Sequence, residues 1–191
     1  MKNKNSPILN PYYVTGFSDG ESCFHVSVGK SSKYKSGFYV NPGFKIGLHK
    51  KDQRLLELIQ SFWGGIGNIT KQKDNAVQYR VLSIKDLAVI INHFDQYPLI
   101  SQKQTDYILF KQICELIKNK EHLTLEGFEK IVTLKASMNL GLSEVLKAAF
   151  PNTIAISNPK VITSKTRDPN GLAGYFWRVK GAFLLKFQKV V

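Results

Sequence analysis

Residues 10–22 read NPYYVTGFSDGES, and the rest of the sequence is interpreted outward from this stretch. Asn10 is a favourable N-cap and Pro11 a favourable first helical residue, so we predict a helix that begins here and runs to Glu21. Within that helix two glycines stand one turn apart, and two acids close it just before an alternating strand. Such spacing of glycines and acids in one short helix indicates that this helix does more than fill the core.

The charge of the chain indicates what it binds. Lysine and arginine number 27 against 14 aspartates and glutamates, which gives a formal net charge of +13 and a pI of about 9.7. This imbalance favours a polyanionic partner, with nucleic acid ahead of a membrane surface or a merely solvated basic face. The 191 residues, 43% of them hydrophobic, are enough to bury one sizeable core.

The cysteines and the apolar segments exclude several other classes of protein. Cys23 and Cys114 fit neither a disulfide framework nor a metal-ligand spacing with histidine, so we predict reduced cysteines in the core. No signal peptide and no apolar run of about 18 residues is found, so we expect a soluble protein without a membrane partner. Lysine far exceeds arginine, a bias typical of A+T-rich organellar genomes, which predicts a location in the mitochondrial matrix.

Hydrophobic periodicity predicts paired strands that alternate with helices. Strands are predicted where apolar and polar residues alternate, over 23–30, 42–50, 66–70 and 77–83. Further helices are predicted from 52 to the glycine pair at 64–65, from 83 to 98, over 101–120, from 124 onward and over 143–150. The segment 151–167 reads as an irregular linker. This order favours an α+β fold in which a four-stranded antiparallel sheet packs on helices by its apolar face.

The other face of that sheet would carry polar side chains. It would present His25, Ser27, Lys45, His49, Asn68, Thr70, Gln78 and Arg80, with Lys30, Lys33, Lys35, Lys71 and Lys73 at the loops that connect the strands. A curved antiparallel ribbon can enter a major groove, where amide, guanidinium and hydroxyl groups contact base edges while loop lysines contact phosphates. We therefore predict that these residues bind nucleic acid, against the alternative of an ordinary solvated sheet face.

Several segments together resemble one protein family. VTGFSDGES, residues 14–22, lies between NPYY and CFHV and resembles the signature helix of the LAGLIDADG homing endonucleases. The predicted order helix-strand-strand-helix-strand-strand-helix is that of the family's half-domain, and the resemblance extends over roughly residues 7–150. It implies the family's half-domain fold and a descent from a nucleic-acid-binding endonuclease.

The resemblance also implies roles for individual residues. In the family two such helices pack side by side, so Gly16 and Gly20 would let two backbones approach closely. The last acid of the family motif holds a divalent metal, and here that residue is Glu21. Mg²⁺ is the implied ion because it takes oxygen ligands and assists phosphodiester hydrolysis. Asp19 is expected to be structural, whereas Lys103 resembles a lysine near the cleavage site of relatives and completes the implied catalytic pair with Glu21.

Two departures from the family pattern favour a loss of cleavage, which would leave the catalytic pair vestigial. Ser22 stands where the motif usually closes with glycine. Leu48 and His49 stand where relatives frequently have a Gln-His pair at the end of the second strand. The leucine would put an apolar side chain where relatives have a polar one near the metal.

A second, incomplete copy of the motif, DPNGLAGY, follows the predicted linker. When its Asp-Pro is aligned with the Asn-Pro of the first motif, Gly174 falls opposite Gly16. Glu21 then falls opposite Val179, or opposite Lys180 after a slip of one residue, so no acid survives in either register. Because cutting two strands generally calls for two metal-binding acids, one acid is missing.

We therefore divide the chain into three parts. Residues 1–150 form a LAGLIDADG-type nucleic-acid-binding domain, 151–167 a linker, and 168–191 a degenerate start of a second half that is too short for another four-stranded sheet. The second helix is expected to fold back beside the first. The bulky residues 176–178 suit such a cover, or a contact with a large assembly, better than a tight symmetric helix pair.

Two functions remain open. In the first, which the missing acid favours, the protein is cleavage-deficient, needs no cofactor, and binds structured RNA as an intron maturase or as a component of an organellar ribosome. In the second, it is an active DNA endonuclease that uses Mg²⁺, and its homodimer brings two Glu21 carboxylates together on a near-palindromic site. A scaffold that contacts no nucleic acid is a third alternative, which the positive charge disfavours.

Overall fold

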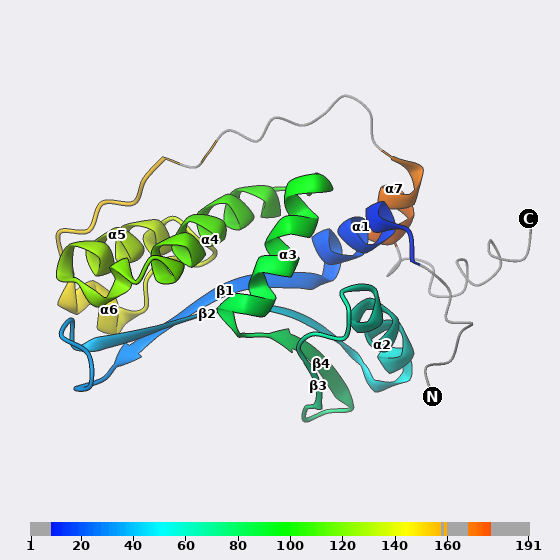
Figure 1. Cartoon of the computed structure of the whole chain (residues 1–191), viewed down its shortest axis with the longest axis horizontal. Coiled ribbons are helices and arrows are strands. Elements are labelled where there is room, and N and C mark those ends of the chain that lie inside the picture. Colours follow the sequence, from blue (N-terminus) through cyan, green and yellow to red (C-terminus); the bar gives the residue numbers. More distant parts are fainter. Residues whose placement is uncertain (1–8, 158, 160–167, 177–191) are drawn as a thin grey trace, which may run out of the picture.

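The computed structural model of the chain describes residues 9–157, 159 and 168–176 (Figure 1). Its helices and strands are, in order, α1 (Pro11–Glu21), β1 (Ser22–Lys30), β2 (Phe38–His49), α2 (Gln53–Phe62), β3 (Asn68–Lys71), β4 (Ala76–Val81), α3 (Ile84–Gln96), α4 (Lys103–Lys118), α5 (Leu125–Ala136), α6 (Glu144–Ala149) and α7 (Pro169–Tyr175). Single 3₁₀ turns at Lys50–Asp52 and Glu121–Leu123 precede α2 and α5. The predicted α+β order is confirmed. None of the helices in these ranges is long and apolar enough to cross a membrane.

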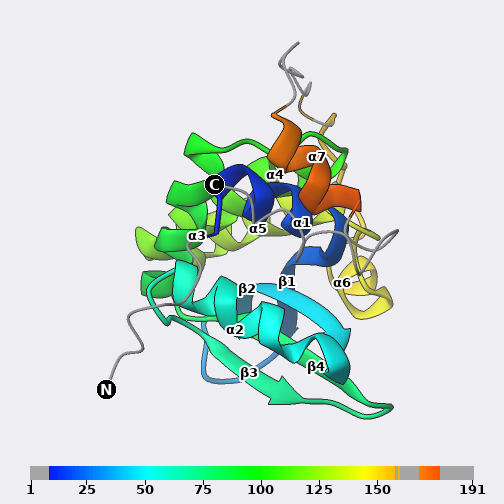
Figure 2. The ribbon, with the colours of Figure 1, turned by 90° about the vertical axis from the view of Figure 1, so that its right-hand side faces the viewer.

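One antiparallel sheet with the strand order β1-β2-β4-β3 forms the base of the molecule. Figure 1 shows α3, α4 and α5 above this sheet, and Figure 2 shows the same layers turned by 90°. Alternate strand residues enter the core beneath the helices, as the period of two in the sequence predicted. The sheet therefore has an apolar side that is covered by helices and a polar side that is not buried in this core.

Aromatic side chains join the sheet to the helices. The ring centroid of Phe24 on β1 lies 5.2 Å from that of Phe44 on β2, 5.4 Å from Phe94 on α3 and 5.3 Å from Phe110 on α4. All four side chains are essentially inaccessible to solvent. Burial of each such side chain contributes roughly 1.5–3 kcal/mol. These contacts fix α3 and α4 on the sheet, and with them the loop that precedes α4.

Residues with a left-handed backbone conformation form the turns that follow α2 and connect β3 to β4. Gly64 and Gly65, which follow α2, have φ of +76° and +80°, as the glycine pair in the sequence predicted. In the β3–β4 hairpin Asp74 and Asn75 have φ of +57° and +55°, and the amide of Ala76 donates to the carbonyl of Lys73. Two successive left-handed residues make a type I′ turn, whose twist matches that of the strands. The hairpin therefore projects its lysines in a defined direction.

β2 begins at Phe38, earlier than the predicted boundary at Pro42. Proline cannot donate a hydrogen bond to a neighbouring strand, so its place within β2 needs an explanation. In the sheet Pro42 pairs with Val26 of β1. The pairing of β2 with β4 extends only from His49 to Phe44 and does not include Pro42. At Pro42 the strand thus has a neighbour on one side only, which is where a strand tolerates proline. As a result, β2 also includes Tyr39 and Asn41, which lie on the polar side of the sheet.

The last described segments agree with the predicted ends of elements. The predicted helix over 143–150 is present as α6, and the predicted linker is irregular at its described residues 151–157 and 159. The second motif forms the seven-residue helix α7, capped like α1 by the side chain of its N-cap residue and with proline as its first residue. The positions proposed opposite Glu21, Val179 and Lys180, lie outside the described residues.

Candidate nucleic-acid interface

Strand register gathers the predicted polar residues on one face of the sheet. Residues that pair directly in an antiparallel ladder point to the same side. Cys23 pairs with Lys45, Lys45 with Arg80, and Arg80 with Asn68, so one row crosses all four strands. The predicted core position is wrong for Cys23, which is half-buried in this row, whereas Cys114 is buried. Neighbouring rows on the same side contain the remaining predicted sheet residues, namely His25, Ser27, His49, Thr70 and Gln78. All eight of the predicted residues therefore share this side, which we call the polar face.

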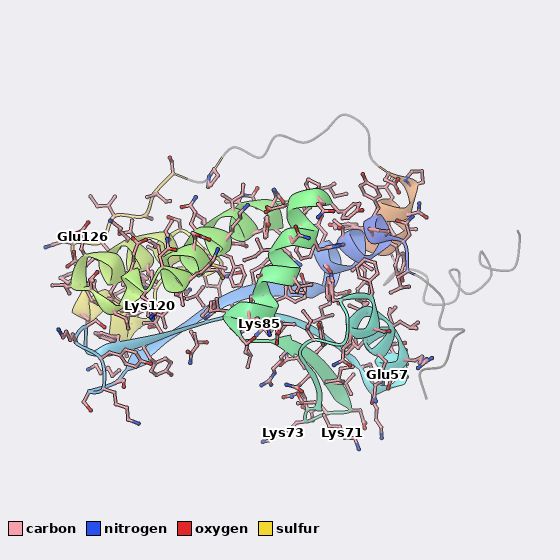
Figure 3. All side chains as sticks on the ribbon, in the orientation of Figure 1. Glu57, Lys71, Lys73, Lys85, Lys120 and Glu126 are labelled. Carbon is pink, nitrogen blue, oxygen red and sulfur yellow. The ribbon has the colours of Figure 1, made fainter. Side chains whose placement is uncertain are left out.

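The predicted lysines lie at the two hairpins that border the polar face. Lys33 and Lys35 are exposed in the β1–β2 loop, and Lys30 is exposed at the last residue of β1. Lys71 and Lys73 are exposed at the β3–β4 hairpin, and Figure 3 shows both extending away from the body of the molecule. Positive charge is thus concentrated at both ends of the curved sheet, which suits contacts to phosphates on either side of a groove.

Hydrogen bonds orient several side chains of the polar face before any ligand is present. Nε of Arg80 donates to Oε1 of Gln78. Nε2 of Gln72 donates to Oγ1 of Thr70 at 2.9 Å. Oriented amides and guanidinium groups are the side chains that bind base edges by two hydrogen bonds. β3 and β4 therefore present donors and acceptors in a fixed arrangement.

The two residues at the end of β2 point to opposite sides of the sheet. The side chain of Leu48 is 8% exposed and belongs to the core, so it does not lie on the polar face. His49 is exposed, and its Nδ1 accepts from the amide of Lys51 at 3.2 Å, which caps the following 3₁₀ turn. The apolar substitution at Leu48 thus has a packing role in this chain, and it carries no argument about cleavage.

Three residues of the polar face were missed by sequence reasoning. Tyr39 and Asn41 pair with Gly29 and Ser27 on the same side, but the predicted strand began after them. Leu82 directly follows β4 and, being two residues after Arg80, lies on the same side of the sheet. Its exposure of 54% is unexpected for a leucine. Alternation continued before the predicted start at residue 42 could have identified Tyr39 and Asn41. Leu82 lies within the predicted strand 77–83, and the parity of Arg80 could have identified it.

Glycines allow α1 and α7 to pack closely, as Figures 1 and 2 show from two directions. A Cβ on Gly16 would overlap the carbonyl oxygen of Gly171, and a Cβ on Gly174 would overlap the carbonyl oxygen of Tyr13. A Cβ on Gly20 would lie 3.3 Å from the carbonyl oxygen of Tyr175, which is a tight but milder contact. The close approach expected from the glycines is therefore present in the helix pair.

The helix pair is also reciprocal. In the alignment of the two motifs Gly174 takes the place of Gly16, and Gly171 takes the place of Tyr13. The contact of Gly16 with Gly171 is thus repeated by the contact of Gly174 with Tyr13. A contact that repeats with its partners exchanged is the property of an interface with two-fold symmetry. α7 therefore occupies the position that a second α1 would take in a symmetric pair.

Lys103 and Asp19 connect the end of α1 to the loop before α4. Nζ of Lys103 donates to the carbonyl oxygens of Ser18 at 3.0 Å and Ser22 at 2.6 Å. A cation is favourable at a helix C-terminus, where carbonyl groups lack helical partners. Burial lowers the pKa of the Lys103 ammonium, and the nearby Asp19, Cys23 and Glu21 partly offset this effect. The ammonium is therefore held in place beside Glu21.

Asp19 has a structural role, as expected. Its side chain is 3% exposed, and Oδ2 accepts from the amides of Ile100 and Ser101 at 2.8 and 3.0 Å. The hydroxyl of Ser101 donates to Oδ1. These bonds use both carboxylate oxygens to hold the loop that positions Lys103. Of the two acids that close α1, Glu21 is therefore the one that remains as a candidate for chemistry.

The donor set at the end of α1 fits one half of a Mg²⁺ site. Mg²⁺ is usually held by one or two carboxylates, and phosphate oxygens and waters complete its shell. Glu21 is half-buried at the last residue of α1 and can supply one such carboxylate. Within the described ranges no three His, Cys, Asp or Glu side chains gather in a way that could hold a metal. Further oxygen ligands would have to come from the nucleic acid or from a second acid.

A groove on the helix layer does not suit nucleic acid. It measures about 690 Å³, lies between α4 and α5, and includes Glu115, Glu121, Glu126 and Glu129 in its lining. Figure 3 shows Glu126 on the helix layer, on the opposite side of the molecule from Lys71 and Lys73. Clustered carboxylates repel phosphates. The carboxylates therefore disfavour nucleic acid at this groove, whereas the hairpin lysines favour it at the polar face.

Comparison with known proteins gives concordant matches. Residues 14–114 match the LAGLIDADG endonuclease family. The probable intron-encoded endonuclease 3 of Neurospora crassa is 40% identical over 169 residues, which are 87% of this chain and 32% of that protein. An uncharacterized 50.9 kDa protein in ND4 intron 1 of Podospora anserina is 55% identical over 118 residues, 61% of this chain and 26% of that protein. The chain thus spans about a third or less of the length of these relatives.

Solved structures share the fold at similar levels of identity. The I-SmaMI LAGLIDADG homing endonuclease bound to cleaved DNA is 46% identical with a TM-score of 0.86, and the match covers 91% of this chain and 58% of that chain. The LAGLIDADG meganuclease I-CpaMI bound to uncleaved DNA is 47% identical with a TM-score of 0.84, covering 88% and 57%. Sequence, helix pair and fold therefore agree, and the chain belongs to the LAGLIDADG endonuclease family.

Proposed function

We propose that this chain binds a specific DNA duplex through its polar face and hydrolyses a phosphodiester bond at Glu21. The observation that carries the proposal is the register that places the eight polar strand residues on one side of the sheet, between two lysine-bearing hairpins. A ribbon of this kind can enter a major groove with its side chains against base edges. The relatives at 46–47% identity that are bound to DNA support DNA as the ligand.

The chemistry proposed at the end of α1 needs a metal, a carboxylate and a cation. When bound, Mg²⁺ would supply an activated water and neutralise charge that develops on the phosphate. Glu21 would hold that ion from the last residue of α1, and phosphate oxygens would complete the shell. Lys103, whose ammonium is fixed by the carbonyls of Ser18 and Ser22, would add positive charge where the phosphate gains negative charge.

Two earlier hypotheses receive less support. The relatives give no support to a repurposed RNA binder or a ribosomal component, and the buried Leu48 removes one argument for a loss of cleavage. Symmetric dimerisation through α1 would require a second copy to displace α7 from the glycine face. We therefore propose DNA as the partner, bound by a chain whose α1 is already paired with its own α7.

An organellar, intron-encoded origin also belongs to this proposal. A relative from Podospora anserina is named for ND4 intron 1, and one from Schizosaccharomyces pombe for cox1 intron 2. The preference for lysine over arginine is in keeping with an A+T-rich organellar coding sequence. Mapping the gene to organellar or nuclear DNA in the source organism tests this origin.

Selection from a randomised DNA duplex library tests the binding. The protein is incubated with the library, bound duplexes are recovered and sequenced, and an RNA library of the same length is selected in parallel. We expect one sequence to be enriched in the DNA arm and none in the RNA arm. Enrichment in the RNA arm alone would replace this proposal with the RNA-binding one.

Nicking of the selected duplex in Mg²⁺ tests the chemistry. We expect the parent protein to nick, and Glu21→Gln to bind with unchanged affinity but to lose activity by at least 10²-fold, on the order expected for an essential metal ligand. Glu129→Gln, in the acidic groove, is the matched control and should retain full activity. Equal nicking by Glu21→Gln and the parent would refute the role of Glu21.

A further inference from the structure

An apolar contact surface lies within the otherwise polar face of the sheet. His25 on β1 pairs with Gly43 on β2, and Leu82 follows β4 in the next place of the same row. A Cβ on Gly43 would lie 2.5 Å from Cε1 of His25 and 2.8 Å from Cδ2 of Leu82. The imidazole ring and the leucine methyl thus both occupy the space above the glycine, and we call this group the His25–Leu82 cluster.

Glycine at position 43 is required for this arrangement. Gly43 is buried although it lies on the polar face, because the two neighbouring side chains cover it. Its backbone φ is not in the left-handed region, so the need for glycine is one of space alone. An alanine would push the ring and the leucine apart. The sequence therefore makes room at this point of the sheet for an imidazole ring beside an apolar leucine side chain.

Leu82 exposes the cluster to solvent, while His25 is half-buried, and the cluster lies beside the charged row. Leu82 is 54% exposed although its strand neighbours Val81 and Tyr79 are fully buried. The adjacent row contains Lys45 and Arg80. Burial, together with these two cations, lowers the pKa of the His25 imidazole, so its ring is neutral at pH 7. The cluster is thus an uncharged surface next to two cations that would lie against a nucleic acid.

Only one chemical group in the major groove matches such a surface. The edges of the bases there present hydrogen-bond donors and acceptors, except for the C5-methyl group of thymine, which apolar side chains contact. A methyl group at C5 of cytosine offers the same chemistry at the same place. RNA lacks this methyl group on uracil. An apolar surface that enters the groove beside cations is therefore matched by a 5-methylpyrimidine.

We propose that Leu82, positioned with His25 over Gly43, contacts the C5-methyl group of a pyrimidine and determines specificity for that base. The inference rests on the proposed DNA-binding function and assigns one part of the recognition to one side chain. Lys45 and Arg80 hold the adjoining base or phosphate. In DNA the C5-methyl group belongs to thymine, and 5-methylcytosine is the second base that carries it.

Selection with three DNA libraries tests this assignment on the full chain. One library contains thymine, the second contains uracil in place of thymine, and the third contains 5-methylcytosine in place of cytosine. Dissociation constants are then measured on the selected duplex with thymine replaced by uracil at one position at a time. At one position we expect the replacement to weaken binding about fourfold, which corresponds to the roughly 0.8 kcal/mol of one buried methyl group.

Variants connect the effect to the cluster. Leu82→Ala should bind the thymine and uracil duplexes equally at that position, and Leu82→Met should retain the difference. Gly43→Ala should reduce the difference with Leu82 still present, because it displaces the ring of His25. Leu140→Ala is the matched control, since Leu140 is 101% exposed on the helix layer and should leave the fourfold difference unchanged.

The outcomes separate this inference from the function on which it rests. Failure to enrich any DNA sequence would contradict the proposed function itself. A selected duplex with no position sensitive to uracil, or one whose sensitivity persists in Leu82→Ala, would overturn the assignment of Leu82 and leave DNA binding standing. Enrichment of cytosine at that position only in the third library would support the assignment and identify 5-methylcytosine as the source of the methyl group.

Discussion

At the scale of single residues, buried polar groups fix the surroundings of α1. Oγ1 of Thr15 donates to the carbonyl of Tyr97 at 3.0 Å, so its oxygen must accept the bond from Nε2 of His93 at the same distance. The hydrogen-bond network thus assigns the proton of the neutral His93 ring to Nε2. This histidine is 6% exposed among aromatic rings. α1 is therefore joined to α3 through a histidine whose burial disfavours the charged form.

Stability should fall at acidic pH because of His93. Burial lowers its pKa from 6.5 to about 4, so the unfolded chain binds a proton between these values and the folded chain does not. The stability that this group contributes is present above pH 6.5 and is lost as the pH falls to about 4, by on the order of 3 kcal/mol. Urea unfolding of the parent and of His93→Gln measures it. Equal pH dependence of the two proteins between pH 6.5 and 4 would contradict this prediction.

Asp19→Asn should destabilise the protein although it is nearly isosteric. The carboxylate accepts three hydrogen bonds from Ile100 and Ser101, and an amide would turn a donor toward one of these donors. We expect a loss of roughly 1.5–3 kcal/mol, the usual range for a hydrogen bond to a charged group. Chemical denaturation gives the value. Asp74→Asn, in an exposed turn with φ of +57°, is the control and should change stability little, because asparagine also tolerates that conformation.

At the scale of elements, the α1–α7 pair depends on backbone proximity. Two glycines on α1 and two on α7 bring carbonyl groups of one helix against α-carbons of the other. Each glycine in a helix interior costs about 1 kcal/mol in propensity relative to alanine. The pair is retained because close packing requires the glycines, and their reciprocal contacts make it resemble a symmetric dimer of two α1 helices.

Alanine at Gly16 and alanine at Gly20 should therefore have different effects. The new Cβ at Gly16 meets backbone atoms of Gly171, so α7 must shift, and overpacking of this kind costs roughly 1–3 kcal/mol. At Gly20 the nearest atom is 3.3 Å away, so the gain in helix propensity should largely offset the contact. Thermal unfolding of both variants provides the comparison. Equal melting temperatures for the two would show that α7 does not pack on α1 as described.

At the scale of the whole molecule, the lysines of the β3–β4 hairpin and the glutamates of the α4–α5 groove lie on different sides. The lysines of the hairpins border the polar face, and the glutamates of the α4–α5 groove lie on the helix layer (Figure 3). A net charge of +13 alone would attract DNA to any surface of the protein. The acidic groove disfavours binding on the helix layer, so DNA should approach the sheet. We therefore expect the separation of charge to determine which side of the protein faces the DNA.

Binding of the selected duplex should depend strongly on salt. Each phosphate contact contributes a slope of about −0.9 to a plot of log K against log salt concentration. Lys71→Gln and Lys73→Gln should each reduce the steepness by about 1, since both side chains are exposed at the β3–β4 hairpin. Lys118→Gln, whose lysine pairs with Glu115 on the helix layer, should leave the slope unchanged. If all three variants had the same slope as the parent, the hairpin would not contact phosphates.

Much of the fold could be read from the sequence because its signals are local. The N-cap Asn10 with Pro11, the alternation along each strand and the glycine pair at 64–65 act over a few residues, so they predicted α1, the sheet and the end of α2. The same alternation predicted which strand residues share the polar face. Family membership followed from the motif of α1 and the order of the elements, and it is confirmed.

Only the tertiary structure decided how distant segments meet. The contacts of Lys103 with α1, of Asp19 with residues 100–101 and of α7 with the glycine face all join parts of the chain that are far apart in sequence. The meeting of His25 and Leu82 over Gly43 depends on register across three strands, which no single segment encodes. Local sequence selects each element through short-range sterics and periodicity, whereas these sites form only when packing of the core brings the elements together.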